Sequence, residues 1–417
     1  MKSLLKHQHH LGFWMVGLAI GFYTYEYFLR VVPSVFIDYY KTNFDFSDTQ
    51  ISIFATAYFM AYTPLQLGVG AIADTFGVRR LLLFSILICL FGTFLTVAVL
   101  QLEPQLVYFS SCVGRFLIGF GSAFAFVAVL KTAREWLPNR YFPTVSGMTT
   151  SIGMLGAIAA QTLLPLLIDA TGHEISLWIM TIIGVWLYII TYRQVYDNPD
   201  HFKPVRTNQM RELFSALITV IKIPQIWIIG LIGSAMFMPT VIFSDLWAPK
   251  FFEDVDHIAH PVSGVLSSML YWGWIAGAPV VGYISSYLDR RRVIIRICSL
   301  VAAIIIGTII YFPTSNAWLV GSMMFTLGLF CSAQILVFAV ANDNVSEKHL
   351  ATGIAVTNML VMCSGFLQPY IGQLLENYAY NDQIFNAAGF RQALMIMPSS
   401  LLLSFLLTFL LKEKGQK

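Results

Sequence analysis

The segment GAIADTFGVRR (residues 70–80) returns in altered form as GYISSYLDRRR (residues 282–292). Each copy begins with glycine, ends in arginines aligned at the same two positions, and follows a long apolar stretch. Apolar stretches that recur on both sides of such a weak repeat suit two helical halves enclosing a central site. The two segments therefore predict a chain built of two similar halves.

The composition places the chain in a membrane. Of its 417 residues, 57% are hydrophobic and 11% are charged, whereas soluble domains carry about a quarter charged residues. Apolar blocks of roughly 20 residues, each long enough to cross a bilayer as a helix, recur throughout. We expect twelve spans, near residues 12–37, 49–73, 80–101, 106–134, 142–169, 175–193, 224–250, 262–288, 292–312, 316–344, 349–378 and 390–411. The expected fold is an all-α membrane protein with twelve transmembrane helices in two six-helix bundles around a central cavity.

The longest polar gap divides these spans into two groups of six. It contains Pro199 and Pro204 and ends in an amphipathic stretch, MRELFSALITVIK (residues 210–222), suited to the membrane surface. We expect an N-terminal bundle at 1–193, a cytoplasmic linker at 194–222 and a C-terminal bundle at 223–417. Lysine and arginine crowd the loops on one side, so the positive-inside rule predicts that both termini are cytoplasmic.

The first repeated segment resembles the loop signature of the major facilitator superfamily, G-x-x-x-D-R-x-G-R-R/K. The matching residues are Gly70, Asp74, Gly77, Arg79 and Arg80, and Thr75 replaces the usual arginine. The fourth span, GRFLIGFGSAF (residues 114–124), is similar to the R-x-x-x-G-x-G pattern of the same superfamily through Arg115, Gly119 and Gly121. The resemblance implies two six-helix bundles that rock around a central cavity.

The repeated segments are expected to form a gate at the cytoplasmic end. Gly70 would let two helices approach closely, and Asp74 would accept hydrogen bonds that lock one conformation. The paired arginines would fix the topology and also take part in this latch. In the second copy Ser286 replaces the acid and Asp289 replaces the glycine, which leaves its part in gating open.

The first span carries two opposite charges within YEYFLRVVPSVF (residues 25–36). Glu26 and Arg30 fall at its middle and outer part, where a charge is costly unless it is paired or faces water. Spaced i and i+4, they share one helical face and would neutralise each other at rest. A proton on Glu26 would free Arg30, whose fork suits a carboxylate or a phosphate. The alternative is a static structural ion pair.

The same stretch resembles the first-span signature of organic anion:cation symporters, a branch of the superfamily, written Y-x-x-R-x-N-x-S-x-A. Tyr27, Arg30 and Ser34 match this pattern, whereas Val32 and Phe36 depart from it. The resemblance implies that Arg30 grips a carboxylate of the substrate.

Other polar side chains at membrane depth complete the candidate site. By the superfamily resemblance Arg115 would bind substrate or couple protons, with a structural hydrogen-bonding role as the alternative. Lys131 would line the cavity or extend to the cytoplasmic surface. Asp245, beside Trp247, would receive an amine or a proton, unless it is a solvated gate residue. Further such polar groups are more often helix-packing hydrogen bonds than ligand contacts, but together they make a plausible cavity lining. They are Tyr58, Tyr62, Gln161, Gln334, Asn358 and Gln368.

Glycines in the fifth and eleventh spans suit close helix packing. They are Gly147, Gly153, Gly156, Gly353, Gly365 and Gly372. Proton-driven drug exporters of the superfamily carry G-x-x-x-G-P-x-x-G-G in the fifth span, and SGMTTSIGMLGAIAA (residues 146–160) lacks that proline. The missing proline counts against export.

Two functions stay open. The first is secondary active, proton-coupled uptake of a small anionic or zwitterionic solute that bears a carboxylate, by alternating access; the alternative is proton-driven export of amphipathic compounds or siderophores. We expect no enzyme, because the sequence shows no nucleophile–base pair, metal-ligand spacing or phosphate loop. We also expect no metal, no cofactor beyond the coupling proton and no nucleic-acid partner, and a monomer in the lipid bilayer of a bacterial inner membrane.

Overall fold

The structure, a computed structural model, describes residues 2–138, 141–197, 209–378 and 387–412. For residues 2–10, 74, 75, 143 and 209–213 it describes the backbone alone. The N-terminal helices, called the first bundle, are α1 (Lys2–Val31), η1 (Val32–Val35), α2 (Ile37–Phe44), α3 (Asp48–Leu65), α4 (Val69–Phe76), α5 (Val78–Ala98), α6 (Pro104–Ser122), α7 (Ala125–Trp136), α8 (Phe142–Thr171) and α9 (His173–Gln194).

The C-terminal helices form the second bundle. They are α11 (Pro224–Met238), η3 (Pro239–Trp247), α12 (Ala248–Asp254), α13 (His260–Leu288), α14 (Arg291–Tyr311), α15 (Ala317–Cys331), η4 (Ser332–Ile335), α16 (Leu336–Asn344), η5 (Glu347–His349), α17 (Leu350–Met362), η6 (Cys363–Leu367), α18 (Gln368–Tyr378), α19 (Ala387–Leu394), α20 (Ile396–Leu407) and η7 (Thr408–Leu410). Between the bundles, α10 (Gln209–Ile221) occupies the amphipathic stretch expected there, and residues 198–208 of the predicted linker lie outside the described part.

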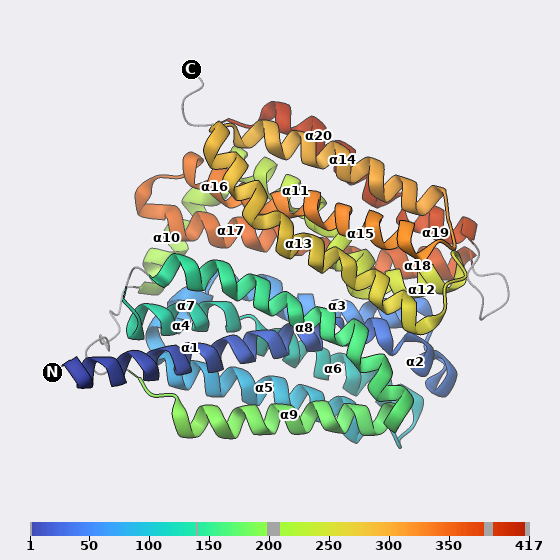
Figure 1. Cartoon of the computed structure of the whole chain (residues 1–417), viewed down its shortest axis with the longest axis horizontal. Coiled ribbons are helices and arrows are strands. Elements are labelled where there is room, and N and C mark those ends of the chain that lie inside the picture. The colour runs from blue at the N-terminus through green and yellow to red at the C-terminus, as the bar shows by residue number, and fades with distance from the viewer. Residues whose placement is uncertain (1, 139–140, 198–208, 379–386, 413–417) are drawn as a thin grey trace.

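Ten helical segments of the described chain are long and apolar enough to cross a membrane. The other two expected spans are α1 with η1 and α2, and α3 with α4, which carry several tyrosines and the acids Glu26 and Asp48. These two spans pack within the same bundle, α1 against α7 and α8, and α3 against α6. In Figure 1 the first bundle, blue to green, lies beside the second, yellow to red, and both termini lie at one end.

Two pairs of interruptions fall at corresponding places in the two bundles. The first span breaks at η1, and its counterpart, the seventh, contains the π-helical segment η3. The fourth span breaks between α6 and α7, and the tenth breaks at the 3₁₀ segment η4. Interrupted helices in matching positions of two repeats are the best structural pointer to a transport site. The candidate site is therefore sought at these breaks.

The two bundles also repeat one close contact. A Cβ on Gly119 of α6 would lie 2.1 Å from the carbonyl oxygen of Tyr58 on α3, so only glycine fits there. A Cβ on Gly328 of α15 would lie 2.0 Å from the carbonyl oxygen of Leu270 on α13. Small residues allow helices to approach this closely in a membrane. The internal repeat read from the loops thus continues in the packing of the second span on the fourth and of the eighth on the tenth.

The second and eleventh spans meet across the two bundles in a regular antiparallel register. A Cβ on Gly372 would lie 2.2 Å from Ser52 Oγ, and one on Gly365 would lie 2.4 Å from the Phe59 ring. One step further, Asn358 Nδ2 donates to Gln66 Oε1 at 3.0 Å. Each step is seven residues along both helices in opposite directions, which is the heptad spacing of left-handed helix pairs.

The bundles are closed at the end away from the termini. There Lys250 of α12 pairs with Asp38 of α2 at 2.9 Å. In the same region a Cβ on Gly264 of α13 would lie 2.2 Å from a carbonyl oxygen of α8. At the end that holds the termini, a Cβ on Gly70, Gly147 or Gly282 would meet no atom of the described chain within 4 Å. In this conformation Gly70 therefore brings no two helices of the described chain together, contrary to the expectation.

Candidate functional site

The site begins where Pro33 breaks the first span. Proline has no N–H, so it leaves the carbonyl of Leu29, four residues earlier, without its helical partner. The chain turns here into the 3₁₀ segment η1, whose bonds reach three residues back, so the Arg30 carbonyl also loses its α-helical partner. Two backbone acceptors are thereby freed inside the bundle.

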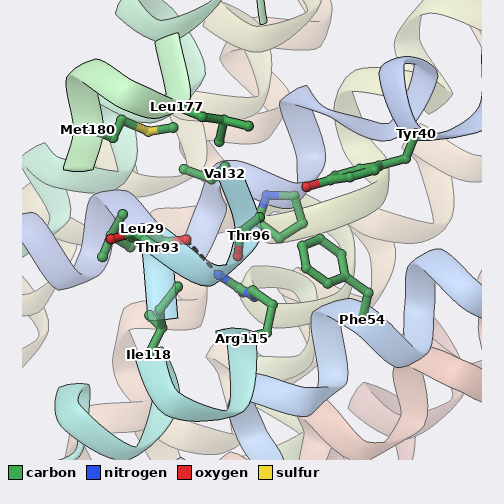
Figure 2. A pocket seen from close by; sticks show the side chains of 11 residues that line it. Leu29, Val32, Tyr40, Phe54, Thr93, Thr96, Arg115, Ile118, Leu177 and Met180 are labelled. Atoms are coloured by element: carbon green, nitrogen blue, oxygen red, sulfur yellow. Dashed lines mark hydrogen bonds between the residues drawn. The ribbon is translucent and has the colours of Figure 1, made fainter. Parts of the chain in front are cut away.

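Arg115 of α6 fills both acceptors. Its Nη1 donates to the Leu29 carbonyl at 2.6 Å and its Nη2 donates to the Arg30 carbonyl at 2.8 Å. Figure 2 shows this fork reaching the Leu29 backbone from the neighbouring helix. A cation at the carbonyl end of a helix is favoured by the helix dipole. Of the two predicted roles of Arg115, this geometry is that of the structural hydrogen-bonding one.

A small cavity lies beside the same break. Its volume is about 30 Å³, and its lining is mostly apolar, with Tyr40, Thr93, Thr96 and Arg115 among the surrounding residues (Figure 2). This is room for one or two water molecules. The cavity therefore belongs to the helix break and is too small for an organic substrate in this conformation.

Arg30 is paired across the two bundles. Its Nε lies 3.1 Å from Asp245 Oδ2 on η3, and both side chains are 5% exposed or less. The guanidinium carbon also lies 4.3 Å from the centroid of the Tyr27 ring one turn earlier, within range of a cation–π contact. The hydroxyl of Tyr271 on α13 donates to Asp245 Oδ1. One carboxylate thus joins an arginine of the first bundle to two helices of the second.

The expected ion pair between Glu26 and Arg30 is wrong in its partner. Glu26 Oε2 accepts a hydrogen bond from the Tyr58 hydroxyl at 2.9 Å, and Arg30 turns to Asp245. The Tyr62 ring stacks on that of Tyr58, with centroids 5.4 Å apart. Glu26 is 1% exposed. The structure thus brings Glu26, Arg30, Arg115 and Asp245 into one buried layer, in which the formal charges of two arginines and two carboxylates cancel.

Three of the amides predicted to line the cavity bind across the bundle interface instead. Gln161 of α8 donates to the carbonyl of Ser244 on η3. Gln368 of α18 donates to the Val241 carbonyl at 2.9 Å and accepts from Thr56 of α3 at 3.3 Å. The third amide is Asn358, in the register described above. The π-helical segment η3 therefore receives polar contacts on both sides, and such segments often mark functional sites.

The remaining candidates lie in other surroundings. Lys131 of α7 donates to the Ala73 carbonyl of α4, which ties the fourth span to the signature loop. Trp247 is fully buried, with its ring centroid 6.5 Å from that of Phe390 in the second bundle. Gln334 is buried within η4. Of these three, Trp247, the last residue of η3, and Gln334 of η4 lie at the matching helix interruptions.

The signature loop is held within the first bundle. The Arg79 N–H donates to Asp197 Oδ1 at 2.8 Å, and its guanidinium donates to the Tyr192 carbonyl at 2.9 Å. Gly77 has φ +75°, and a Cβ there would lie 2.9 Å from Asp197 Oδ1, so the position demands glycine. The Asp74 side chain lies outside the described residues, and Arg80 is exposed. The gating role of this loop stays a prediction.

In the second copy of the loop, Asp289 adopts the left-handed conformation that ends α13, with φ +48°. Aspartate tolerates this conformation better than most residues, which explains why it can replace glycine at a helix end. Arg291 pairs with Asp343 at the end of α16, within the second bundle. In each copy an acid thus accepts a bond from an arginine, through the backbone N–H of Arg79 in the first and through the guanidinium of Arg291 in the second.

Sequence reasoning missed Tyr271 and Pro33. Tyr271 lies at membrane depth in the eighth span, the counterpart of the span that supplied Tyr58 and Tyr62. Applying the internal repeat to polar aromatic residues would have found it. Pro33 was quoted in the first-span pattern, and its missing N–H was a signal for unpaired carbonyls that a nearby arginine must satisfy.

Comparison with known proteins shows the family to which this chain belongs. Residues 11–369 match the Major Facilitator Superfamily. The chain is 23% identical over 389 residues to the probable anion transporter 5 of Arabidopsis thaliana, with 87% of each chain covered. It is 24% identical over 216 residues to the probable sulfoacetate transporter SauU of Cupriavidus necator, covering 51% of this chain and 47% of that one.

A solved structure shares the whole fold. It is a bacterial homologue of the human lysosomal transporter Spinster in an inward-facing and unoccupied conformation, and it superposes with a TM-score of 0.75 at 14% identity, covering 96% of each chain. The helical bundles, the matching interruptions and the sequence match agree with one another. The chain belongs to the Major Facilitator Superfamily and is a multi-pass membrane transporter rather than an enzyme.

Proposed function

We propose that this chain takes up a small carboxylate-bearing anion or zwitterion together with protons, by alternating access. The observation that carries the proposal is the ion pair between Arg30 and Asp245, which lie 3.1 Å apart on different bundles. The two relatives named above, an anion transporter and a sulfoacetate transporter by their names, support an anionic substrate.

Asp245 holds the place that a substrate carboxylate would take. Arginine binds carboxylates through charge-assisted hydrogen bonds, and a second carboxylate can bind Arg30 only if Asp245 withdraws or loses its charge. A proton on Asp245 removes the competition and keeps the layer neutral when an anion enters. Substrate and proton then bind together, which is the requirement for symport.

Alternating access supplies the route. The bundles are closed at the end away from the termini, where Lys250 pairs with Asp38. With both termini in the cytoplasm, as the positive-inside rule predicts, this closed end is the outer one. Because Arg30 and Asp245 lie on different bundles, a change in their pairing acts directly on the interface that must rearrange.

The test is uptake into proteoliposomes under an imposed pH gradient, with labelled sugar acids, dicarboxylates, amino acids and sulfoacetate as substrates. Asp245→Asn mimics the protonated acid, so it should still bind and exchange substrate but lose accumulation driven by the gradient. Arg30→Lys should lower affinity by at least tenfold, because lysine lacks the planar fork. Asp169→Asn, at an exposed carboxylate near the end of α8, is the matched control and should behave as wild type.

The outcomes separate the alternatives. Full transport by the Arg30→Lys and Arg30→Ala variants would exclude Arg30 as the anion site. If Asp245→Asn still accumulates substrate and Glu26→Gln does not, Glu26 carries the proton. Stabilisation of the purified protein by lipophilic cations alone, unchanged in Arg30→Ala, would replace uptake with export.

A further inference from the structure

A second arginine site lies on the outside of the second bundle, where α14 packs against α20 and η7. Arg296 of α14 donates from Nε to Thr408 Oγ1 at 3.0 Å. Its guanidinium carbon lies 3.7 Å from the centroid of the Phe409 ring, as in a cation–π contact. The side chain is thereby fixed along the seam between the two helices.

The surroundings of this arginine face lipid. Exposed apolar side chains flank it on both helices, with Ile297 of α14 53% exposed and Leu406 of α20 59% exposed. Figure 1 shows α14 and α20 along the outer edge of the second bundle. Arg296 lies only one and a half turns from the start of α14, at the end of the molecule that holds the termini. That depth is close to the headgroups of the adjacent leaflet.

Among the described residues, no acid pairs with Arg296 at this seam. The Arg296 side chain is partly exposed, and its Nη2 is enclosed by protein without an acceptor among the described residues. Within the described part, the charge that acts on the Arg296 guanidinium is that of Arg292, one turn away. Arg292 itself donates to the Leu411 carbonyl at 3.2 Å. The nearby acid Asp343 is paired with Arg291.

We propose that Arg296 binds the phosphate of an anionic phospholipid headgroup in this seam. A phosphate oxygen supplies the opposing charge at the partly exposed guanidinium, in the way that basic pockets between transmembrane helices bind anionic headgroups elsewhere. The exposed apolar residues on either side, Ile297 and Leu406, accommodate the acyl chains, which a free phosphate ion would leave uncovered. The proposal is independent of the transported substrate.

The test uses the whole protein in phosphatidylcholine nanodiscs titrated with phosphatidylglycerol, with bound lipid counted by native mass spectrometry. Arg296→Gln should weaken retention of phosphatidylglycerol by about tenfold or more, as expected for loss of a charge-assisted contact. Arg290→Gln removes the same charge from an exposed neighbour at the start of the same helix and should leave retention unchanged. Inorganic phosphate at matched concentration should not displace the lipid.

Three results would overturn the proposal. Equal losses in Arg296→Gln and Arg290→Gln would indicate surface charge without a site. Displacement by inorganic phosphate would indicate an ion site. Unchanged retention in Arg296→Gln would show that no lipid phosphate binds there. If that variant does not fold, Arg296→Lys keeps the charge while losing the bond to Thr408, and wild-type retention in this second variant would equally contradict a site built on the fork.

Discussion

Removing the Arg115 fork should destabilise the fold, and removing the proline that requires it should reverse part of that loss. Arg115→Met leaves the Leu29 and Arg30 carbonyls without their protein partner inside the bundle. Each unsatisfied buried carbonyl costs about 1–3 kcal/mol, and relief of the buried arginine charge offsets part of the sum. We expect a net loss of about 2–4 kcal/mol in the free energy of unfolding, by the same reasoning.

Pro33→Ala restores a backbone N–H opposite the Leu29 carbonyl and lets the helix continue. In that background Arg115→Met should cost less, with a coupling free energy of about 1–2 kcal/mol in the double-mutant cycle. Transport of the substrate should fall in Pro33→Ala, because a continuous first span moves Arg30 relative to Asp245. Pro33→Ala thus raises the stability of the Arg115→Met variant but lowers transport, a combination that simple misfolding would not produce.

The assay is denaturant unfolding in mixed micelles for the wild type, both single variants and the double variant. Pro165→Ala is the matched control, since Pro165 also lies inside a helix but Arg115 does not contact the carbonyl four residues before it. The effects of Pro165→Ala and Arg115→Met on the free energy of unfolding should be additive within about 0.5 kcal/mol. A coupling between Pro33 and Arg115 of the same small size would refute the capping explanation.

Three further predictions concern the closed end and one loop. Lys250→Met removes the ion pair with Asp38. The equilibrium should shift toward opening at that end by about two- to fivefold, as expected for a partly exposed pair. Spin-label distances between α2 and α12 measure this shift. Burial raises the pKa of Asp256 to about 6. Its contribution to the free energy of unfolding is therefore full below about pH 4 and is lost as pH rises through about 6. Asp256→Asn should flatten this dependence, worth about 2–3 kcal/mol, in thermal unfolding from about pH 4 to 7. Gly264→Val should lower Tm, because its Cβ would clash with a carbonyl of α8, whereas Gly282→Val should leave Tm unchanged; equal shifts would contradict the glycine argument.

The fold was predictable because its signals are local. Apolar blocks, loop charges and the repeated glycine–arginine segments each lie within a few residues of one another, so a single sequence shows them. The ten long apolar helices and the superfamily membership confirm the helical membrane fold, and the sidedness read from the loop charges stays a prediction. The burial of Glu26, Arg30, Arg115 and Asp245 was also predictable, because charged side chains within apolar spans face the interior of the bundle rather than lipid.

The partners of those charges were not predictable in the same way. Helical spacing placed Glu26 and Arg30 on one face, but the strongest partner of Arg30 comes from the other bundle, and no local pattern indicates which helices meet there. The amides Gln161 and Gln368 show the same difficulty, since a polar group that bonds another helix looks identical in sequence to one that faces a cavity. The open surroundings of Gly70 add a further reason, because one sequence must serve two conformations and a single structure shows the contacts of one.

The heptad register between the second and eleventh spans links two stretches that are far apart in the chain. Inserting one residue after Phe59 would rotate everything beyond it by about 100° and turn Gln66 away from Asn358, while leaving the contact of Ser52 with Gly372 intact. Inserting a full seven residues would restore the phase. Natural length variation in this protein should therefore be confined to the loops, and any insertion tolerated within either span should come in whole heptads.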